Sequence, residues 1–316
     1  MYRTAAVVLI SLLALLAGAL PAQALAATST TADGLSWSIR PGSTDAAQRS
    51  NFSYTLDPGA TIQDTLVVTN LGSTPLDLAV YAADGVTSAS GHLDLEPAAT
   101  AAAGVGSWFA AEAATITVQP GAAREVPFSL AVPADASPGD HVGGVVTSFV
   151  SAAAQGTVKL DRRLATRLNV RVAGEETIAM AISDVTVNYP AAWNPFAPVA
   201  PEVTYTVTNN GNVRALADEN VDASGLLGAG AASGAVAELI PGGSSTRTVT
   251  LPGTWPIFAG NATVVLQPWS VAGSPGTEVT AAASTAAVPW GQLAVLLVVV
   301  VLAVILARRR ARQARA

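Results

Sequence analysis

Short segments in which apolar and polar residues alternate follow one another along most of the chain. FSYTL at residues 52–56 and LDLAVY at residues 76–81 show the pattern most clearly. Turn-forming residues separate such segments, as DPG does at 57–59 and NLGS at 70–73. Alternation with a period of two is typical of a strand with one buried face, and no helical period is sustained between residues 33 and 285. The exported part is therefore predicted to be all-β, in antiparallel immunoglobulin-like sandwiches.

Two stretches far apart in the chain share one pattern, which indicates an internal repeat. TLVVTNLG at residues 65–72 resembles TYTVTNNG at residues 204–211. Each is followed later by a Pro-Gly turn that leads into another strand, Pro120-Gly121 in the first case and Pro241-Gly242 in the second. We therefore predict two tandem immunoglobulin-like β-sandwich domains. Their predicted bounds are 33–175 and 176–270.

Both ends of the chain are apolar in ways that indicate export and anchoring. Residues 1–26 combine a basic start, an apolar run and small-x-small cleavage patterns, which predicts a secretory signal peptide. Residues 288–307 are apolar over about the length that spans a bilayer and are predicted to be a transmembrane helix. Arginines crowd residues 308–316, so the positive-inside rule places this tail in the cytoplasm and most of the chain outside. Residues 271–287 are predicted to be a flexible stalk.

The exported part of the chain is strongly acidic. Six of the 16 basic residues lie in the two ends, whereas all 22 acidic residues lie between Asp33 and Glu278. Such a surface repels polyanions, so nucleic-acid binding is not expected. The chain has no cysteine, which excludes disulfides and thiolate metal sites. Stability must therefore come from burial of apolar surface.

VPADASPGDHVGGVV, residues 132–146, places two aspartates next to one of the chain's two histidines. Such a group suits a metal or acid–base site, but zinc normally needs three or four convergent ligands. Aspartate, proline and glycine are also the residues that build turns. We predict a structural turn and no metal, with a weak site as the alternative. The predicted turn residues are Asp135, Pro138, Gly139 and Asp140.

The known sequence signatures of catalysis are missing. The chain has no G-x-S-x-G elbow, no P-loop, no H-E-x-x-H and no EF-hand loop. Aromatic residues make up only 5% of the chain, which is poor for a sugar-stacking cleft. We predict that the protein is not an enzyme and has no cofactor.

A basic segment near residue 165 is the most unusual feature of the exported part. If this segment is a strand, Arg163, Arg167 and Arg171 share one face, about 13 Å apart, and leucines and valines share the other. We call these three residues the arginine row. Guanidinium groups bind carboxylates and phosphates, such as those of wall polymers, so the row is a candidate ligand-binding site. The alternative is that the arginines pair with acids on neighbouring strands.

Three motifs in one order carry a family resemblance. YTLDPGATIQDTLVVTN (54–70), VPADASPGDHVGGVV (132–146) and DRRLATRLNVRVAGE (161–175) resemble the peptidoglycan-binding domain of WxL-interacting cell-surface proteins. The resemblance implies a signal peptide, two immunoglobulin-like domains, one transmembrane helix and a basic tail. It also implies that the first domain binds peptidoglycan and the second binds another protein. The chain itself contains no W-x-L.

Together these features predict a non-catalytic binding protein of a Gram-positive-type bacterium. It is expected to be a single-pass membrane protein whose first domain binds peptidoglycan or another anionic wall polymer. A surface-protein partner is expected at the second domain. The alternative is a structural spacer or accessory subunit that pairs with another exported protein and binds no glycan.

Overall fold

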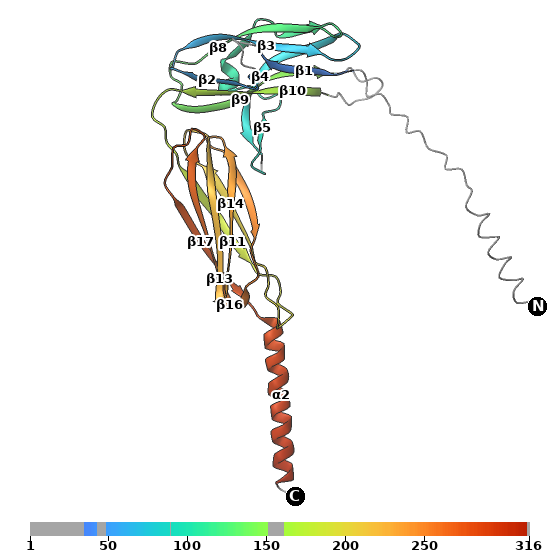
Figure 1. Cartoon of the computed structure of the whole chain (residues 1–316), viewed down its shortest axis with the longest axis vertical. Coiled ribbons are helices and arrows are strands. Elements are labelled where there is room, and N and C mark those ends of the chain that lie inside the picture. Colours follow the sequence, from blue (N-terminus) through green and yellow to red (C-terminus); the bar gives the residue numbers. More distant parts are fainter. Residues whose placement is uncertain (1–34, 43–48, 89, 151–160, 315–316) are drawn as a thin grey trace, which may run out of the picture. The chain divides into compact units, whose positions relative to one another are not determined.

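The computed structural model describes residues 35–42, 49–88, 90–150 and 161–314 (Figure 1). The predicted signal peptide, residues 1–26, lies outside these residues. The described part is mostly β-strand and ends in one long helix, as the sequence predicts. The strands form four sheets, two from residues 37–172 and two from residues 180–287, which we call the N-terminal and C-terminal sheet pairs.

The N-terminal sheet pair contains ten strands. The first sheet has the order β1 (Trp37–Pro41), β3 (Thr61–Asn70), β8 (Ala123–Ala131), β6 (Phe109–Ala111). The second has the order β2 (Phe52–Leu56), β10 (Asp161–Val172), β9 (Gly139–Val150), β4 (Leu76–Thr87), β5 (Leu93–Leu95), with β7 (Thr115–Val118) also paired to β4. A short 3-10 helix, η1, spans Val105–Trp108.

The prediction of purely antiparallel sandwiches is wrong at one place, since β2 and β10 pair in parallel. The two sheets bury the apolar side of each alternating strand between them. Phe52 of β2 meets Phe128 of β8 edge to face, with ring centroids 5.1 Å apart. Trp37 of β1 donates its indole N–H to the hydroxyl of Thr147 of β9 over 2.8 Å. These contacts between strands of different sheets make the N-terminal pair a sandwich.

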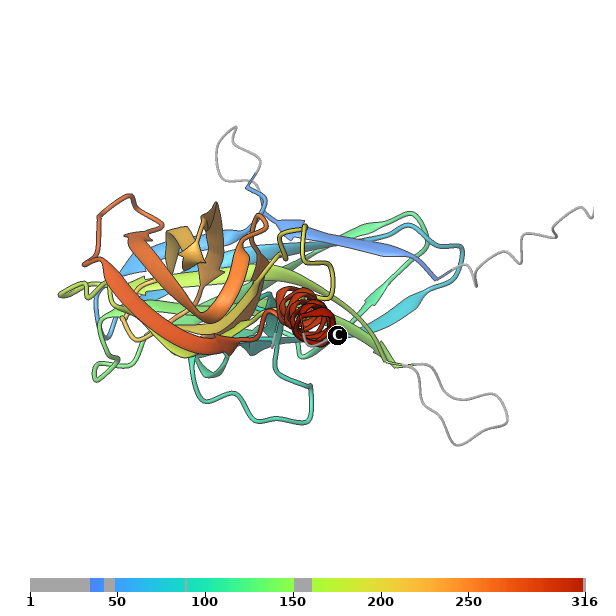
Figure 2. The same ribbon diagram turned by 90° about the horizontal axis from the view of Figure 1, so that it is seen from below.

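The C-terminal sheet pair has one sheet of three strands and one of four. The three-stranded sheet has the order β11 (Met180–Asn188), β12 (Glu202–Asn209), β15 (Ser244–Thr250). The four-stranded sheet has the order β14 (Ala229–Leu239), β13 (Ala215–Leu227), β16 (Trp255–Ser270), β17 (Val279–Ala287). Figure 2 shows these twisted strands, yellow to orange, curving about a common interior. That interior is one apolar cluster, in which Tyr205, Val264 and Leu266 are completely buried.

The flexible stalk predicted over residues 271–287 is wrong for its second half. Val279–Ala287 forms β17, which pairs antiparallel with β16 from Phe258↔Ala287 to Leu266↔Val279. The small residues of this segment let it add to a sheet edge, because backbone hydrogen bonds do not depend on side-chain size. Only two residues then separate β17 from the helix α2 (Trp290–Gln313).

The repeat predicted from the sequence reappears as one hydrogen-bonded corner in both sheet pairs. The side-chain amide of Asn70 donates to the carbonyls of Thr74 and Val118, at 2.8 and 2.9 Å. Asn209 donates in the same way to the carbonyls of Val213 and Leu239, at 2.8 and 3.0 Å. Each asparagine also accepts an N–H from the glycine two residues on. Both asparagines are completely buried.

The helix α2 is 24 residues long, and nearly all of its apolar side chains are exposed. It is long and apolar enough to cross a membrane, with a mean hydropathy of 2.7 over its most apolar window. The predicted span of 288–307 therefore lies mostly within this helix, which continues through the first arginines of the predicted basic tail to Gln313.

Candidate functional site

Residues 132–146 are divided between a turn, a bend and the strand β9. Asp135 lies in an exposed turn and Pro138 in a bend, as predicted. Gly139 and Asp140 were predicted to belong to the same turn, but they are the first two residues of β9 and are buried. They pair with Val172 and Arg171 of β10, and this pairing extends the strand into the expected turn.

Asp140 forms the centre of a buried ion-pair cluster. Its side chain is only 3% exposed. Arg171, directly opposite in the β9–β10 register, binds both of its oxygens, through Nε at 2.8 Å and Nη2 at 2.9 Å. The backbone N–H of Arg214 donates to Oδ2 at 2.8 Å, and the guanidinium Nε of Arg214 lies 3.4 Å away. One carboxylate thus joins β9 and β10 to Arg214, the residue directly before β13 of the C-terminal sheet pair.

The surroundings of Asp140 favour its charged form. Burial by itself would raise its pKa, but the hydrogen bonds from Arg171 and from the Arg214 N–H, with the charges of both arginines, lower the pKa below its ordinary value. In return, the carboxylate raises the pKa of Arg171. A carboxylic acid that donates a proton in catalysis needs the opposite shift.

A second set of contacts holds the same region together. The backbone N–H of Asp140 donates to the carbonyl of Asn212 over 2.7 Å. The Asn212 side-chain amide donates to the carbonyls of Pro138 and Glu175, at 3.1 and 2.8 Å. Gly139 has φ = 121°, and a Cβ there would overlap the carbonyl oxygen of Asn212. Glycine is therefore required at this position.

The rest of the arginine row is also paired with acids. Arg167 binds Glu238, which Arg214 approaches at 3.3 Å, and donates through Nε to the Asn169 side chain at 3.0 Å. Arg163 lies 3.8 Å from the carboxylate of Asp161, and both side chains are more than one third exposed. Its guanidinium also donates to the carbonyl of Glu96 over 3.5 Å. Pairing with acids was the alternative prediction for the row, and it describes Arg167 and Arg171. Ligand binding by the row stays a prediction, for which Arg163 is the most accessible member.

The other buried carboxylates are neutralised in the same way. Asp64 is bound by two nitrogens of Arg49, at 2.7 and 2.9 Å, and its pKa is lowered because these bonds and the Tyr54 hydroxyl outweigh burial. Glu219, which is 3% exposed, lies 2.5 Å from Nε of Arg247. Each of these two carboxylates is thus paired with an arginine of the same sheet pair.

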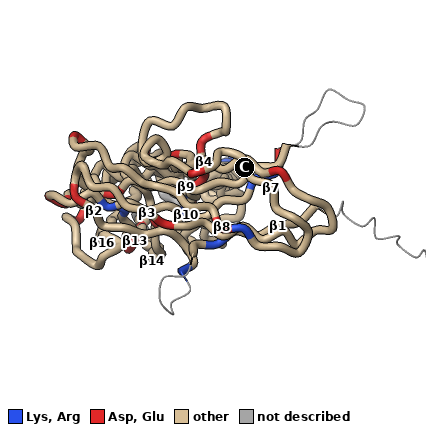
Figure 3. Tube along the Cα trace, turned by 90° about the horizontal axis from the view of Figure 1, so that it is seen from above, with Lys and Arg blue, Asp and Glu red and all other residues tan. Residues whose placement is uncertain are grey.

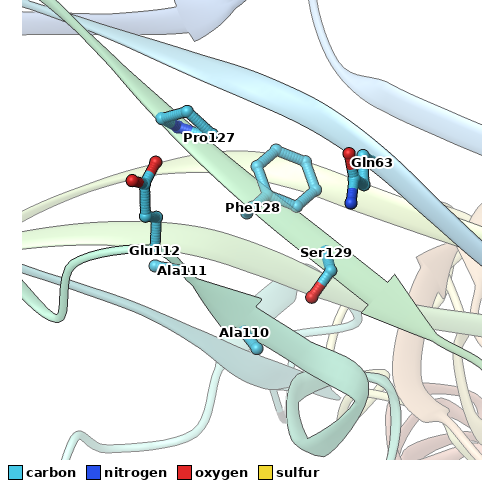
Figure 4. Close-up of a pocket in the computed structure, with 7 residues that line it drawn as sticks. All are labelled: Gln63, Ala110, Ala111, Glu112, Pro127, Phe128 and Ser129. Atoms are coloured by element: carbon cyan, nitrogen blue, oxygen red, sulfur yellow. The ribbon is translucent and has the colours of Figure 1, made fainter.

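Two hollows in the surface have few chemically active side chains that are free of partners. One of about 350 Å³ lies over β8, beside β3 and β6, where Phe128 forms the floor and Glu112 is the one ionisable residue of the lining (Figure 4). Another, of about 270 Å³, borders Asp140, Arg171 and Arg214, whose charged groups already bind one another. Within the described ranges, no three histidine or acidic side chains come together as a metal site would require.

His141 is accounted for by local contacts. Its Nε2 lies 2.8 Å from the carbonyl oxygen of Ser137, and its ring lies 4.6 Å from that of Trp108.

Figure 3 shows that Lys and Arg occur as short, separate stretches of the described trace. The sequence could not have revealed Glu238 as the partner of Arg167, because the two residues lie 71 positions apart. The same holds for Asp140, whose partner Arg214 lies 74 positions away.

Comparisons with known proteins add little to this geometry. No family model and no curated protein matches the chain. Among solved structures, it is similar to a chaperone–tip adhesin complex of CFA/I fimbriae (TM-score 0.39, 10% identity, 80% of this chain and 99% of that one). It is also similar to the class 5 fimbrial chaperone CfaA (TM-score 0.35, 14% identity, 80% of this chain and 100% of that one). A third similar structure is the Pseudomonas aeruginosa CupB2 chaperone (TM-score 0.31, 12% identity, 74% of this chain and 97% of that one). TM-scores below 0.5 do not establish a shared fold, so function has to be argued from the chain itself.

Proposed function

We propose that this protein is a non-catalytic binding protein held in the cell membrane by α2, with two tandem immunoglobulin-like domains outside. The observation that carries the proposal is the exposed apolar surface of a 24-residue helix that follows a sandwich strand after only two residues. Such a surface is stable in lipid and unstable in water. The arginines at its C-terminal end favour a cytoplasmic location for that end.

The finer proposal is that the N-terminal sheet pair binds an anionic wall polymer, as the family resemblance implies. Within the arginine row, Arg163 is the member suited to contact a ligand, since its one acidic contact is long and solvent-exposed. Arg167 and Arg171 are less suited to contact a ligand, because their guanidinium groups are already bound to Glu238 and Asp140. A membrane anchor adds to such contact, because the tether raises the effective concentration at the wall.

A sedimentation assay with purified peptidoglycan tests the finer proposal. The full chain in detergent micelles is mixed with the polymer, and the bound fraction is compared with that of Arg163→Gln. Arg124→Gln is the matched control, since Arg124 is exposed on the other sheet of the same pair. We expect Arg163→Gln to lose most of the bound protein and Arg124→Gln to lose little. Equal binding of both variants and the parent would contradict a role for the row.

The second candidate function is a spacer or accessory subunit for another exported protein. It is favoured by the observation that acids of the same chain already occupy Arg167 and Arg171. In that case the full chain leaves peptidoglycan unbound, and crosslinking on intact cells yields a defined protein partner. Retention by peptidoglycan treated to remove all protein would exclude this candidate.

A further inference from the structure

The loop from β11 to β12, residues 189–201, exposes two large aromatic side chains. Trp193 is 71% exposed and Phe196 is 83% exposed. A soluble surface seldom shows such residues side by side without a partner. The backbone of the loop is restricted, because it contains four prolines and because the side chain of Asn194 accepts the backbone N–H of Phe196 at 3.0 Å.

This loop is bound to the first turn of α2. The N–H of Gly291 donates to the carbonyl of Ala192 over 2.7 Å, and the Gln292 amide donates to the carbonyl of Pro195 over 3.3 Å. The rings of Trp193 and Trp290 stack, with centroids 6.2 Å apart and planes 20° apart. A Cβ on Gly291 would lie 2.5 Å from the Trp193 carbonyl oxygen, so this close approach needs glycine.

A third segment brings another aromatic side chain to the same place. Phe258, at the start of β16, is 65% exposed and is paired with Ala287, three residues before α2 begins. Its φ of 59° is rarely adopted by an aromatic residue. Tyr189, the first residue of the loop, packs on Gly260 of the same strand, where a Cβ would overlap its ring. We call Trp193, Phe196, Phe258 and Trp290 the aromatic tip.

The segments that build the aromatic tip carry no charge. Residues 185–201, 248–277 and 279–307 contain no Lys, Arg, Asp or Glu. The closest charge along the loop is Glu202, the first residue of β12. Aromatic residues without neighbouring charges are the composition found at the boundary between lipid headgroups and hydrocarbon. Charged side chains would have to be dehydrated there at a cost.

We propose that the aromatic tip inserts into the outer surface of the phospholipid bilayer that α2 spans. The inference rests on the proposed membrane anchoring, since the tip surrounds the point where α2 begins. The partner is the lipid interface itself, recognised by exposed indole and phenyl rings and by the absence of charge. The tip then forms a second contact with the membrane, which fixes the C-terminal sheet pair at the bilayer instead of leaving it free on a tether.

Spin labels on the full chain test this inference, because the protein has no cysteine of its own. Three single variants are reconstituted into phosphatidylcholine vesicles and labelled with a nitroxide. Phe196→Cys reports on the tip, Val299→Cys on the middle of α2, and Ala235→Cys, exposed on β14, is the aqueous control. Accessibility to oxygen and to a water-soluble nickel complex gives the depth of each label.

We expect the label at residue 196 to lose most of its accessibility to nickel relative to residue 235, and the label at 299 to lose nearly all of it. If 299 is shielded and 196 is as accessible as 235, the tip proposal is overturned while the membrane anchor stands. If 299 is itself accessible, both proposals fail. A label at Trp193→Cys, on the other exposed ring of the loop, must agree with that at 196.

Discussion

Asp140 shows how one residue acquires its role from partners that are distant in the chain. It is a buried carboxylate between two arginines, one 31 residues away and the other 74. An uncompensated carboxylate at this depth would be strongly destabilising, and the paired one holds three segments together. Its charge is therefore a structural requirement, and the pH at which that charge is lost matters for stability.

The first prediction concerns Asp140→Asn. Because folding lowers the pKa of Asp140, the charged form adds stability above the ordinary pKa of an aspartate, and this stability is lost as the pH falls through the lowered value. The variant is expected to lose about 3–5 kcal/mol at pH 7 and to show a weaker loss than the parent between pH 5 and pH 2.5. Urea unfolding across this range measures both, with the exposed Asp135→Asn as control. Parallel pH curves for parent and variant would contradict the ion-pair account.

The second prediction compares two neighbouring asparagines. Asn209→Ala leaves the carbonyls of Val213 and Leu239 without their side-chain donor in a buried corner, which is expected to cost about 1–3 kcal/mol. Asn210→Ala changes an exposed side chain next to it and should be close to neutral. Thermal unfolding of both variants measures the difference. A similar loss in both would mean that the corner contributes little.

At the scale of elements, β17 determines where the C-terminal sheet pair ends. It covers the edge of β16, whose Val264 and Leu266 are completely buried. An uncovered edge strand exposes unpaired backbone groups and invites association with other chains. The segment therefore belongs to the sandwich and cannot serve as a free linker to α2.

The third prediction follows from this position of β17. A soluble fragment that ends at Val288 is expected to be monomeric, whereas one that ends at Glu278 is expected to aggregate. Size-exclusion chromatography of the two fragments, prepared alike, distinguishes the outcomes. Equal monomer yields would mean that residues 279–287 are not needed for the sandwich, as the predicted stalk implies. A third fragment that ends at Val288 but carries Gly and Ser in place of residues 279–287 separates loss of the strand from loss of length.

At the level of the full chain, charge and apolar surface occupy separate regions, and the proposed anchoring rests on that separation. The acidic residues lie ahead of Glu278 and a run of arginines follows α2. In the proposed arrangement, α2 crosses the bilayer between these regions and the arginines lie on the cytoplasmic side.

The fourth prediction is that the full chain stays with membranes through an alkaline carbonate wash, whereas a variant that ends at Val288 is released. Burial of α2 in hydrocarbon, rather than charge, holds the full chain, so high salt should not extract it. Added protease outside sealed spheroplasts should digest the chain up to α2 and spare an epitope placed after Gln313. Digestion of that epitope would contradict the proposed orientation.

Local pattern was enough to predict several features. The strands around 52–56 and 76–81, the two TN-x-G corners and the apolar helix all appear in the structure, because period-two alternation and apolar run length act within one element. A turn at Asp135 follows from the same local chemistry.

The contacts between residues that are distant in the sequence follow from the fold and not from local pattern. The sequence placed three arginines on one face, but the β9–β10 register gave Arg171 the partner Asp140, and contacts with the C-terminal sheet pair gave Arg167 the partner Glu238. The fold also turned the expected stalk into β17 and brought Trp193 against Trp290. Ion pairs, sheet edges and aromatic clusters depend on residues that the chain brings together from afar, and no local pattern encodes that distance.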